Sequence, residues 1–305
     1  MSIPATNRPY PIAIGKMEIT IKEHFSRQAP VVKQLFKSNL LFTSGVIIIT
    51  GWILIAIFAG VIAPADPIAQ DMAHRFEPPS SSYWCGTDEL GRDILSRVLM
   101  GARLSLMAGL VATILAGTIG TLWGGIAGYM GGRIDDVMMR FSEMVWAFPP
   151  LVLAMTITAA LGPSLYNTLL AMVVVAWPSY ARIMRSMVIA TKENEYVEAA
   201  RVLGASHFRI LFGEVFANSI GPVLVLATLD LGNMILIFAG LGFLGLGSPP
   251  PTPEWGAMVA AGVPYFTYWW MTTFPGLGIF SISLAANFVG DGLRDFLDPK
   301  LRKEF

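Results

Sequence analysis

Long apolar runs without charged residues are the feature that most constrains how this chain can fold. The run from Leu40 to Ile62 contains no charged residue, and at about 1.5 Å per helical residue it can cross a hydrocarbon core of about 30 Å. The whole chain is 54% hydrophobic and only 14% charged, which is too apolar for a soluble globular domain. Ala63-Pro64-Ala65 faintly resembles a signal-peptide cleavage site, but the apolar run begins too late and is too long for a signal peptide. The sequence therefore predicts a membrane protein with a retained first anchor.

Five further apolar segments follow, so we expect an all-α integral membrane protein with six transmembrane helices. FPP at 148–150 predicts a kink or a break in the third span, and Pro178 lies inside the fourth. The expected spans are 40–62, 104–129, 142–161, 167–187, 216–240 and 272–289. In the second span, small residues at every fourth position predict close helix packing: Ala112, Ala116, Gly120, Gly124 and Gly128.

The distribution of basic residues predicts how the spans are oriented. If both termini are cytoplasmic, the turn expected at 131–140 and the stretch at 182–214 also lie inside. Only four basic residues then lie outside: Arg75, Arg92, Arg97 and Arg103. The 21 lysines and arginines less these four leave 17 on the cytoplasmic side, which is the positive-inside pattern. The reverse orientation would invert it.

These expectations divide the chain into five segments, all read from the sequence. They are a cytoplasmic tail with an amphipathic helix (1–39), a first anchor (40–62), a periplasmic loop (63–102), a five-helix core (103–290) and a cytoplasmic tail (291–305). The core includes a cytoplasmic loop at 193–218. It also includes a second outer segment, 241–271, that is rich in proline, glycine and aromatic residues and has no lysine or arginine.

A charged stretch at 195–218 stands between two apolar segments and carries two helical repeats. The first repeat is Tyr196, Ala199, Ala200 and Leu203, and the second is Phe208, Leu211, Phe212 and Val215. Gly204 between them tolerates the left-handed conformation that a sharp turn between helices needs. Ala199 and Ala200 leave the first face nearly bare, so another protein can approach the backbone closely. The pattern predicts a helical knob that fits into a partner; the alternative is an ordinary polar loop with an interfacial helix.

The periplasmic loop ends in the run GTDELGRDILSRVLMGARLSL, from Gly86 to Leu106. Its interleaved charges could suggest a catalytic or metal cluster, but such alternation is more typical of a structural salt-bridge network. The charged residues are Asp88, Glu89, Arg92, Asp93, Arg97 and Arg103. We expect a structural network here, with Cys85 beside it as an exposed or half-buried thiol.

Several of these motifs resemble those of ABC-importer permeases. Glu198-Ala199-Ala200, three residues and then Gly204 resemble the EAA loop of that group, which docks into a groove on the ATP-hydrolysing subunit. PPSSSYW, the run after it and GDGLRDFLDPKLR resemble the dipeptide, oligopeptide and nickel permeases, so that the resemblance covers residues 78–303. The chain departs from the family at Ala217, where a proline is usual, which puts the bend into the next membrane helix in doubt.

The resemblance implies a MetI-like permease core, a place in a bacterial or archaeal inner membrane, and two functional surfaces. The residues of the ATPase-coupling surface would be Glu198, Ala199, Ala200, Arg201, Gly204, Ala205, His207 and Arg209. Those of the periplasmic motif would be Gly86, Thr87, Asp88, Gly91, Arg92 and Asp93. The implied partners are a homologous second permease, two ABC ATPase subunits and an extracytoplasmic solute-binding protein. Residues around Trp255 are candidate contacts for that binding protein, unless the outer segment simply packs over the spans.

The sequence carries no sign of chemistry of its own. It has no GxxxxGK[ST] stretch, so we expect no cofactor on this chain, and ATP and Mg would be used by the partner ATPase subunits. Its one cysteine and three widely separated histidines predict neither a metal site nor a catalytic residue. A formal net charge of zero gives no sign of a nucleic-acid partner; membrane lipid is the expected surrounding.

We therefore expect a non-catalytic permease subunit of an ATP-driven importer for di- or oligopeptides or peptide-like solutes. Nickel and opine-like solutes are alternatives, because relatives with similar motifs carry them. A secondary transporter or channel would need several ionisable residues deep in the membrane, whereas only Asp230 lies deep in a span. A membrane enzyme would need clustered His, Asp, Glu or Cys, which the spans lack.

Asp230 and Asn233 lie one helical turn apart, so they share a face of the fifth span. A lone charge there costs about 2.5–3.5 kcal/mol in lipid, so Asp230 should face the pore or a neighbouring subunit. We expect the pair to line the translocation path; the alternative is a hydrogen bond or ion pair at the contact with the second permease.

Overall fold

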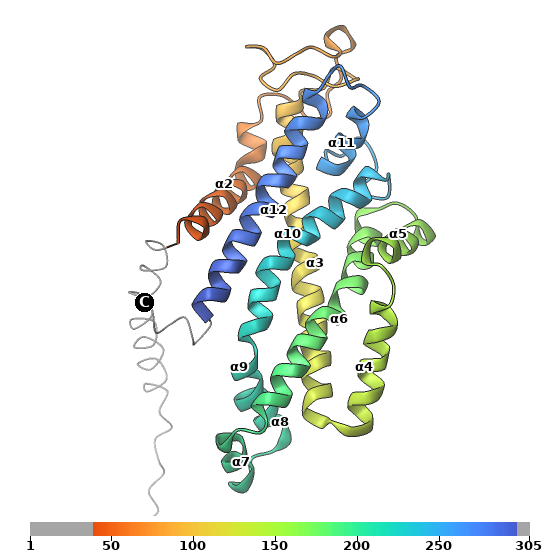
Figure 1. The fold of residues 1–305 in the computed structure, drawn as a ribbon. Helices are drawn as coiled ribbons and strands as arrows, with labels where there is room; N and C mark the ends of the chain where they lie inside the picture. The colour runs from red at the N-terminus through yellow and green to blue at the C-terminus, as the bar shows by residue number, and fades with distance from the viewer. Residues whose placement is uncertain (1–38, 298–305) are drawn as a thin grey trace, which may run out of the picture.

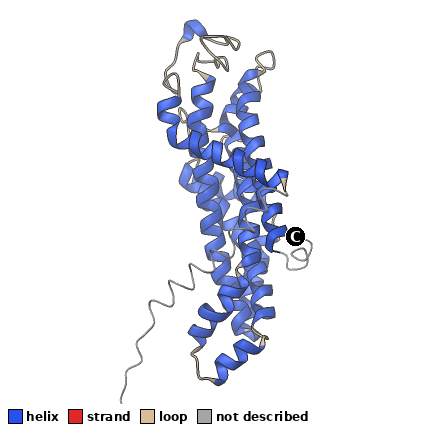
Figure 2. Ribbon diagram, turned by 90° about the vertical axis from the view of Figure 1, so that its left-hand side faces the viewer, coloured by secondary structure: helices blue, strands red, loops and turns tan. Residues whose placement is uncertain are grey.

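The computed structural model describes residues 39–297, which form a bundle of long helices joined by short segments (Figure 1). Within these residues there is no strand, only one isolated bridge between Thr87 and Asp93, and the view in Figure 2 shows the same helical architecture from another side. The all-α prediction is therefore confirmed for this part of the chain. The amphipathic helix expected within residues 1–39 and the last eight residues, 298–305, lie outside the described residues, apart from Asn39.

Helix α2 (Leu40–Ile62) forms where the first anchor is predicted and lies along α12 (Trp270–Leu297). It begins at Asn39, whose side-chain oxygen accepts a hydrogen bond from Phe42 N at 2.9 Å. Gly45 permits the close approach, because a Cβ there would lie 2.8 Å from a backbone oxygen of α12. Much of the remaining surface of α2 is exposed and aliphatic, as a lipid-facing helix requires. The exposed residues include Ile47, Leu54, Ile57 and Val61.

The centre of the bundle is α3 (Ile94–Met130), packed along α6 (Leu165–Thr191). The ridge of small residues in α3 is buried, as predicted. A Cβ added at Gly120 or Gly124 would collide with the backbone of α6, so these glycines set the distance between the two helices. Pro178 lies inside α6 without ending it.

The stretch at 131–140, predicted as a short turn, is helical instead. Gly131, with φ of +66°, alone separates α3 from α4 (Gly132–Trp146). The turn prediction considered only the charges and missed a helical repeat of apolar residues between them: Ile134, Val137, Phe141 and Met144.

The chain breaks after α4, as the FPP motif predicts. Helix α5 (Pro150–Leu161) follows and is bent by 83° from α4. Pro149 and Pro150 explain the break, because proline lacks the amide hydrogen of a helix and disfavours helical backbone in the residue before it. The pair α4–α5 is therefore one broken span or a re-entrant segment.

Four helices are long and apolar enough to cross a membrane, namely α2, α3, α10 (Gly221–Phe243) and α12, and the bent pair makes five if it is one span. Helix α6, with 27 residues, is long enough but is not counted with them on composition. The described residues thus contain four or five candidate spans. The span expected at 167–187 coincides with α6 and stays a prediction, as does the cytoplasmic position of both termini.

Between α6 and α10 the chain forms the predicted knob at one end of the bundle (Figure 1). It consists of α7 (Glu195–Val202), α8 (His207–Arg209), the π-helix η2 (Ile210–Val215) and α9 (Phe216–Ser219). The span expected from residue 216 begins only at Gly221, because Ile220 interrupts the helix and Pro222 occupies the first turn of α10. The interruption therefore lies beside Gly221 and Pro222, whereas Ala217 lies inside α9.

The opposite end carries the loop 63–93, with the short helix η1 (Met72–His74), and helix α11 (Trp255–Gly262). Trp255 is fully buried, and its Nε1 donates a hydrogen bond to Val98 O at 3.0 Å. The indole ring fits because Gly101 and Gly278 have no side chains against it. The expectation that Trp255 contacts a binding protein is therefore wrong: this part of the outer segment packs over the spans.

Two boundaries differ from those expected. Helix α3 begins at Ile94, inside the stretch assigned to the periplasmic loop, and α12 continues past residue 290 to Leu297. In both places the helix extends beyond the apolar span by about two turns or more that include charged residues, and a prediction based on hydropathy assigns such residues to the neighbouring segment.

Candidate functional site

The turn of the knob is built as its sequence predicts. Gly204 has φ of +79°, the left-handed region that glycine enters without penalty. Its amide donates to Arg201 O at 3.0 Å, and the amide of Ala205 donates to Ala200 O at 3.1 Å. These two bonds make a Schellman motif, which satisfies the last carbonyls of α7. Ser206 then caps α8 by accepting a hydrogen bond from Arg209 N.

The first helical repeat of the knob does not form a buried face. Val197 is the fully buried residue of α7, and Ala200 is half-buried against the core. Tyr196, Ala199 and Leu203 are exposed instead. The apolar repeat of α7 therefore points mostly away from the bundle, as a docking surface would.

The second repeat is divided between the core and the surface. Leu211 and Val215 are buried, whereas Phe208 and Phe212 are exposed and contact each other with ring centroids 4.6 Å apart. Phe212 lies in the π-helix η2, whose wider turns shift its residues from α-helical register, whereas Phe208 lies before it in α8. Sequence spacing assumes a regular α-helix and so cannot predict this division.

The tip of the knob is apolar although its sequence is rich in charge. Val202, Leu203 and Phe208 are 80%, 86% and 73% exposed, values that a folded chain seldom gives large apolar side chains unless another surface covers them. Nearby, Glu198 and Arg201 form an exposed ion pair at 2.8 Å, and His207 Nδ1 lies 3.1 Å from Tyr129 OH of α3. Val202 is a residue that the helical repeats did not include.

The knob is attached to the bundle at both of its ends. Lys192 Nζ donates to Gly128 O of α3 at 2.7 Å, and Ser219 Oγ donates to Thr191 Oγ1 of α6 at 3.0 Å. These bonds connect the knob to the central pair α3 and α6.

Asp230 and Asn233 lie together, as their spacing predicts. Asn233 Nδ2 donates to Asp230 Oδ1 at 3.3 Å. Tyr180 of α6, which is fully buried, donates from its hydroxyl to Asp230 Oδ2 at 2.9 Å. This tyrosine was not predicted from the sequence, because it lies 50 residues away along the chain. The group connects α6 with α10 midway along the bundle.

The periplasmic motif forms a buried network at the other end of the molecule. Asp88 Oδ2 accepts from Arg92 Nε at 2.6 Å and lies 3.6 Å from Arg97 Nε. Asp93 caps α3, accepting from Ser96 N at 2.7 Å. Thr87 O accepts a hydrogen bond from Trp270 Nε1 of α12 at 3.1 Å. The ion pairs confirm the predicted salt-bridge network, and the network connects the loop to the ends of α3 and α12. Arg103, which was expected in it, is exposed and forms no ion pair with these residues.

Gly86 and Gly91 of this motif have φ of +75° and +71°, and a Cβ at either would collide with the backbone of the same loop. Cys85 beside them is half-buried, and burial together with nearby Asp93 raises the pKa of its thiol to about 11. A thiol with that pKa is almost entirely protonated at neutral pH and reacts slowly.

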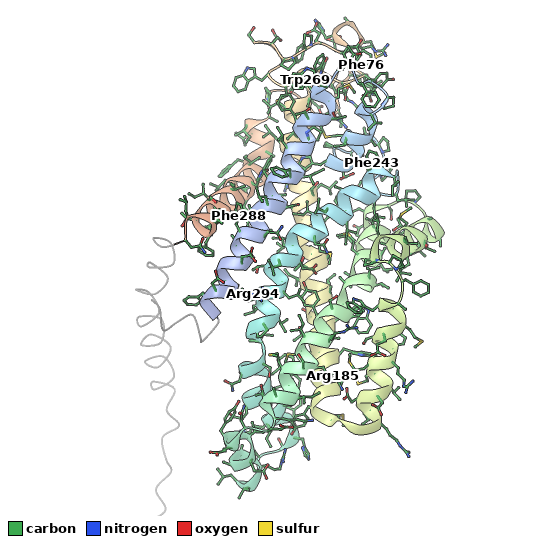
Figure 3. The ribbon with its side chains drawn as sticks, viewed as in Figure 1. Phe76, Arg185, Phe243, Trp269, Phe288 and Arg294 are labelled. Carbon is green, nitrogen blue, oxygen red and sulfur yellow. The ribbon has the colours of Figure 1, made fainter. Side chains whose placement is uncertain are left out.

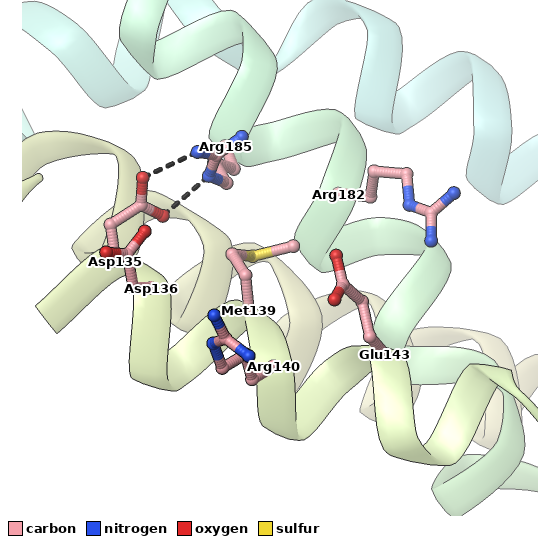
Figure 4. A pocket seen from close by; sticks show the side chains of 7 residues that line it. All are labelled: Asp135, Asp136, Met139, Arg140, Glu143, Arg182 and Arg185. Atoms are coloured by element: carbon pink, nitrogen blue, oxygen red, sulfur yellow. Dashed lines mark hydrogen bonds and ion pairs between the residues drawn. The ribbon is translucent and has the colours of Figure 1, made fainter. Parts of the chain in front are cut away.

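A cavity of about 490 Å³ opens between α4 and α6 (Figure 4). Its lining residues are Asp135, Asp136, Met139, Arg140, Glu143, Arg182 and Arg185. In Figure 3, Arg185 lies in the half of the bundle nearer the knob, far from Phe76 and Trp269 at the other end. The sequence did not predict this cavity, because four of its seven lining residues come from the stretch at 131–140 that was expected to be a turn.

Within residues 39–297 no group of three or more His, Cys, Asp or Glu side chains is placed to hold a metal ion. The residues predicted for function thus lie in three separate places: the knob at one end, the pair Asp230 and Asn233 midway, and the periplasmic motif at the other end.

Comparison with known proteins adds a family to this geometry. A family model described as binding-protein-dependent transport system inner membrane component matches residues 120–303, and one described as N-terminal TM domain of oligopeptide transport permease C matches residues 31–79. The probable D,D-dipeptide transport system permease protein DdpC of Escherichia coli (strain K12) is 45% identical, over 89% of this chain and 91% of the relative. The dipeptide transport system permease protein DppC of the same strain is 46% identical, over 88% and 92%. The oligopeptide transport system permease protein OppC of Bacillus subtilis (strain 168) is 42% identical, over 88% of each chain.

Proposed function

Because the chain belongs to the family of binding-protein-dependent transport system inner-membrane components, we propose that it forms half of the translocation pore of an ATP-driven importer for di- or oligopeptides. The observation that carries the cargo assignment is the similarity to relatives named for dipeptide or oligopeptide transport. These relatives align with about nine-tenths of both chains at 42–46% identity. A second, homologous permease forms the other half of the pore.

The six-span topology with both termini in the cytoplasm is part of this proposal. Five spans correspond to α2, α3, α4–α5, α10 and α12, and α6 is the sixth. This arrangement places the knob in the cytoplasm, and the periplasmic motif and α11 outside. It is supported by the positive-inside pattern of the lysines and arginines.

The knob is the contact for the ATPase subunits in this proposal. Its exposed apolar tip, Val202, Leu203 and Phe208, enters a groove on the partner, and the exposed pair Glu198 and Arg201 lies beside it. ATP and Mg²⁺ are bound and used in the ATPase subunits, which pull on the knob when they close. Alternating access follows if nucleotide and cargo each stabilise different states of the pore.

The direct test is peptide uptake by proteoliposomes that contain this chain, its second permease and its ATPases, with the binding protein added outside. We expect uptake of a labelled dipeptide such as dialanine only when both ATP and the binding protein are present. Uptake that needs neither would instead identify a secondary transporter or channel. ATP-driven uptake of nickel but of no peptide would reassign the cargo.

A further inference from the structure

The cavity between α4 and α6 contains charges of both signs in equal number. Its ionisable residues are three acids and three arginines: Asp135, Asp136, Glu143, Arg140, Arg182 and Arg185. The formal charges of this lining sum to zero. A site for a simple anion or cation would carry an excess of the opposite charge, so this lining suits a ligand that is itself both positive and negative.

One pair within the lining is fully engaged and forms a wall of the cavity. Arg185 donates to both carboxylate oxygens of Asp135, from Nε at 2.5 Å and from Nη2 at 2.6 Å (Figure 4). This two-bond geometry is the strong form of an arginine–carboxylate pair. It connects α6 to α4, and each of the two charges balances the other.

The other four charges form no close ion pair, although Asp136 and Glu143 lie near enough to Arg185 to interact with it electrostatically. Among the residues that the structure describes, the side chains of Asp136, Arg140, Glu143 and Arg182 make no ion pair or hydrogen bond. Arg182 instead stacks on the ring of Trp146, with its guanidinium carbon 3.5 Å from the ring centroid. Stacking fixes the guanidinium plane while its N–H donors stay free for a carboxylate. Figure 4 shows the carboxylate of Glu143 on the same side of the cavity as the guanidinium of Arg182.

The position of this site shows that it faces water or protein rather than lipid. The four charged side chains without an ion pair are exposed on the chain: Asp136, Arg140, Glu143 and Arg182. The cavity lies in the half of the bundle nearer the knob, where Figure 3 places Arg185. Exposed ionisable groups of a membrane protein face water or other protein groups, because contact with lipid would desolvate them.

We propose that this cavity is a transit site for zwitterionic peptides, in which Arg182 receives the carboxylate and Glu143 receives the ammonium group. A volume of about 490 Å³ lies within the range of small-molecule sites. The two termini of an extended dipeptide lie about 7 Å apart, and Arg182 and Glu143 both line this one cavity. Arg140 and Asp136 offer a second pair of charges for a longer or reversed peptide. This inference rests on the proposed peptide-importer function and names a site for its cargo on this chain.

The test measures binding of labelled dialanine to the assembled transporter in phosphatidylglycerol nanodiscs, without the binding protein. Two analogues each remove one charge: N-acetyl-dialanine lacks the ammonium group and dialanine amide lacks the carboxylate. We expect wild-type protein to bind each analogue about tenfold more weakly than dialanine, the usual effect of losing one charged hydrogen bond.

Two variants then identify which residue reads which charge. Glu143→Gln should lose the preference for dialanine over N-acetyl-dialanine and keep the preference over the amide. Arg182→Gln should lose the preference for dialanine over dialanine amide and keep the preference over N-acetyl-dialanine. Arg182→Lys should restore part of the preference over the amide. The matched control is Arg133→Gln, an exposed arginine on the same helix α4 outside the cavity, which should bind all three ligands as wild type does.

Several outcomes would overturn the inference. The first is the absence of saturable dialanine binding at millimolar concentration. The second is that both variants keep the ligand preferences of wild type. The third is the same change in both variants, which would mean that Glu143 and Arg182 pair with each other and not with the peptide. Displacement of dialanine by phosphatidylethanolamine added to the nanodiscs would assign the cavity to a zwitterionic lipid headgroup. ATP-driven dialanine uptake by wild type in proteoliposomes is measured in parallel. If wild type takes up dialanine but the two variants keep its ligand preferences, the site is rejected and the proposed function stands. If the variants change the preferences as predicted but wild type shows no uptake, the function is rejected and the site stands.

Discussion

At the scale of single residues, Asp230 has hydrogen-bond partners in this chain but no basic residue paired with it among the described residues. Tyr180 and Asn233 each donate one hydrogen bond to its carboxylate. These bonds are made within one chain, so the carboxylate does not need the second permease as its partner. Because Tyr180 is fully buried and Asn233 is exposed, Asp230 lies where the packed interior of the bundle meets its surface.

We predict that Asp230→Asn keeps the fold and lowers uptake, most strongly for cationic peptides. The asparagine oxygen can still accept from Tyr180, so the hydrogen bond between α6 and α10 persists while the negative charge is lost. Transport should be measured with a neutral and a cationic dipeptide, together with assembly and basal ATPase activity, which should stay near wild type.

Tyr180→Phe is the matched control for this prediction. It removes the hydrogen bond and keeps the charge, so it should cost about 1 kcal/mol of stability without changing the preference between the two peptides. If Asp230→Asn instead prevents assembly with the second permease, the residue is structural. Uptake of both peptides at the wild-type level by the Asp230→Asn variant would remove the residue from the translocation path.

Glu254 is a second residue with a measurable signature. It is fully buried and caps α11, accepting from Gly256 N at 2.7 Å and Ala257 N at 2.8 Å. Burial raises the pKa of this carboxyl from its ordinary value of 4.5 to about 7, although the two hydrogen bonds act in the opposite direction. The folded state therefore holds the proton more tightly than the unfolded state does.

The sign of the pH dependence follows from that difference. Stabilisation from the protonated Glu254 is complete below about pH 4.5 and is lost as pH rises through about 7. We predict that the melting temperature of the purified protein in detergent falls by a few degrees between pH 5 and pH 8, and that Glu254→Gln flattens this fall. His74, whose pKa is raised by its hydrogen bond to Asp71, contributes with the same sign but is exposed and so contributes little. A wild-type melting temperature that rises over this range would contradict the assignment.

At the scale of elements, the knob depends on one backbone conformation. Nothing lies within 4 Å of a Cβ built at Gly204 or at Gly213 in the same knob, yet only Gly204 has a positive φ. A side chain at Gly204 should therefore cost about 1–2 kcal/mol through the backbone alone. The same substitution at Gly213, inside a helical segment, should be neutral or slightly stabilising.

We predict that Gly204→Ala weakens co-purification with the ATPase subunits and lowers uptake, whereas Gly213→Ala does neither. Ala199→Trp tests the surface itself: Ala199 is exposed, so the large ring should block docking and leave the fold intact. Ala200 is less informative, because it packs partly against the core. If Gly204→Ala and Ala199→Trp both assemble and transport normally, the knob is not the ATPase contact.

The elements also show how far the sequence could predict the fold. Long apolar runs predicted α2, α3 and α12, and local backbone chemistry predicted the break at FPP and the turn at Gly204. What could not be predicted depends on contacts distant in sequence or on irregular helices. Trp255 is buried because two glycines from other helices leave room for it, and the wider turns of the π-helix η2 change the register that places Phe212 at the surface. The cavity was missed for a different reason: charges alone suggested a turn where α4 forms.

At the scale of the whole molecule, the two ends are built for different surroundings. One end carries the knob and the charged cavity, and the other carries the buried network of the periplasmic motif and several exposed aromatic residues: Trp84, Phe266 and Trp269. Exposed tryptophan and phenylalanine at the end of a membrane bundle suit either the lipid headgroup region or a protein partner. The proposed orientation places these aromatic residues outside and the knob inside.

The orientation can be tested with a membrane-impermeant thiol reagent on intact cells. Native Cys85 should give little background, because it is half-buried and its pKa of about 11 keeps the thiol protonated; Cys85→Ala removes it altogether. In that background we predict that Ser80→Cys and Thr252→Cys, both at exposed positions in the outer loops, are labelled from outside. Val202→Cys, at an 80% exposed position of the knob, should be labelled only after the membrane is permeabilised, which shows that its thiol is reactive but inaccessible. Labelling of Val202→Cys in intact cells, with Ser80→Cys and Thr252→Cys protected, would reverse the orientation, and with it the assignment of the knob to the cytoplasmic ATPases.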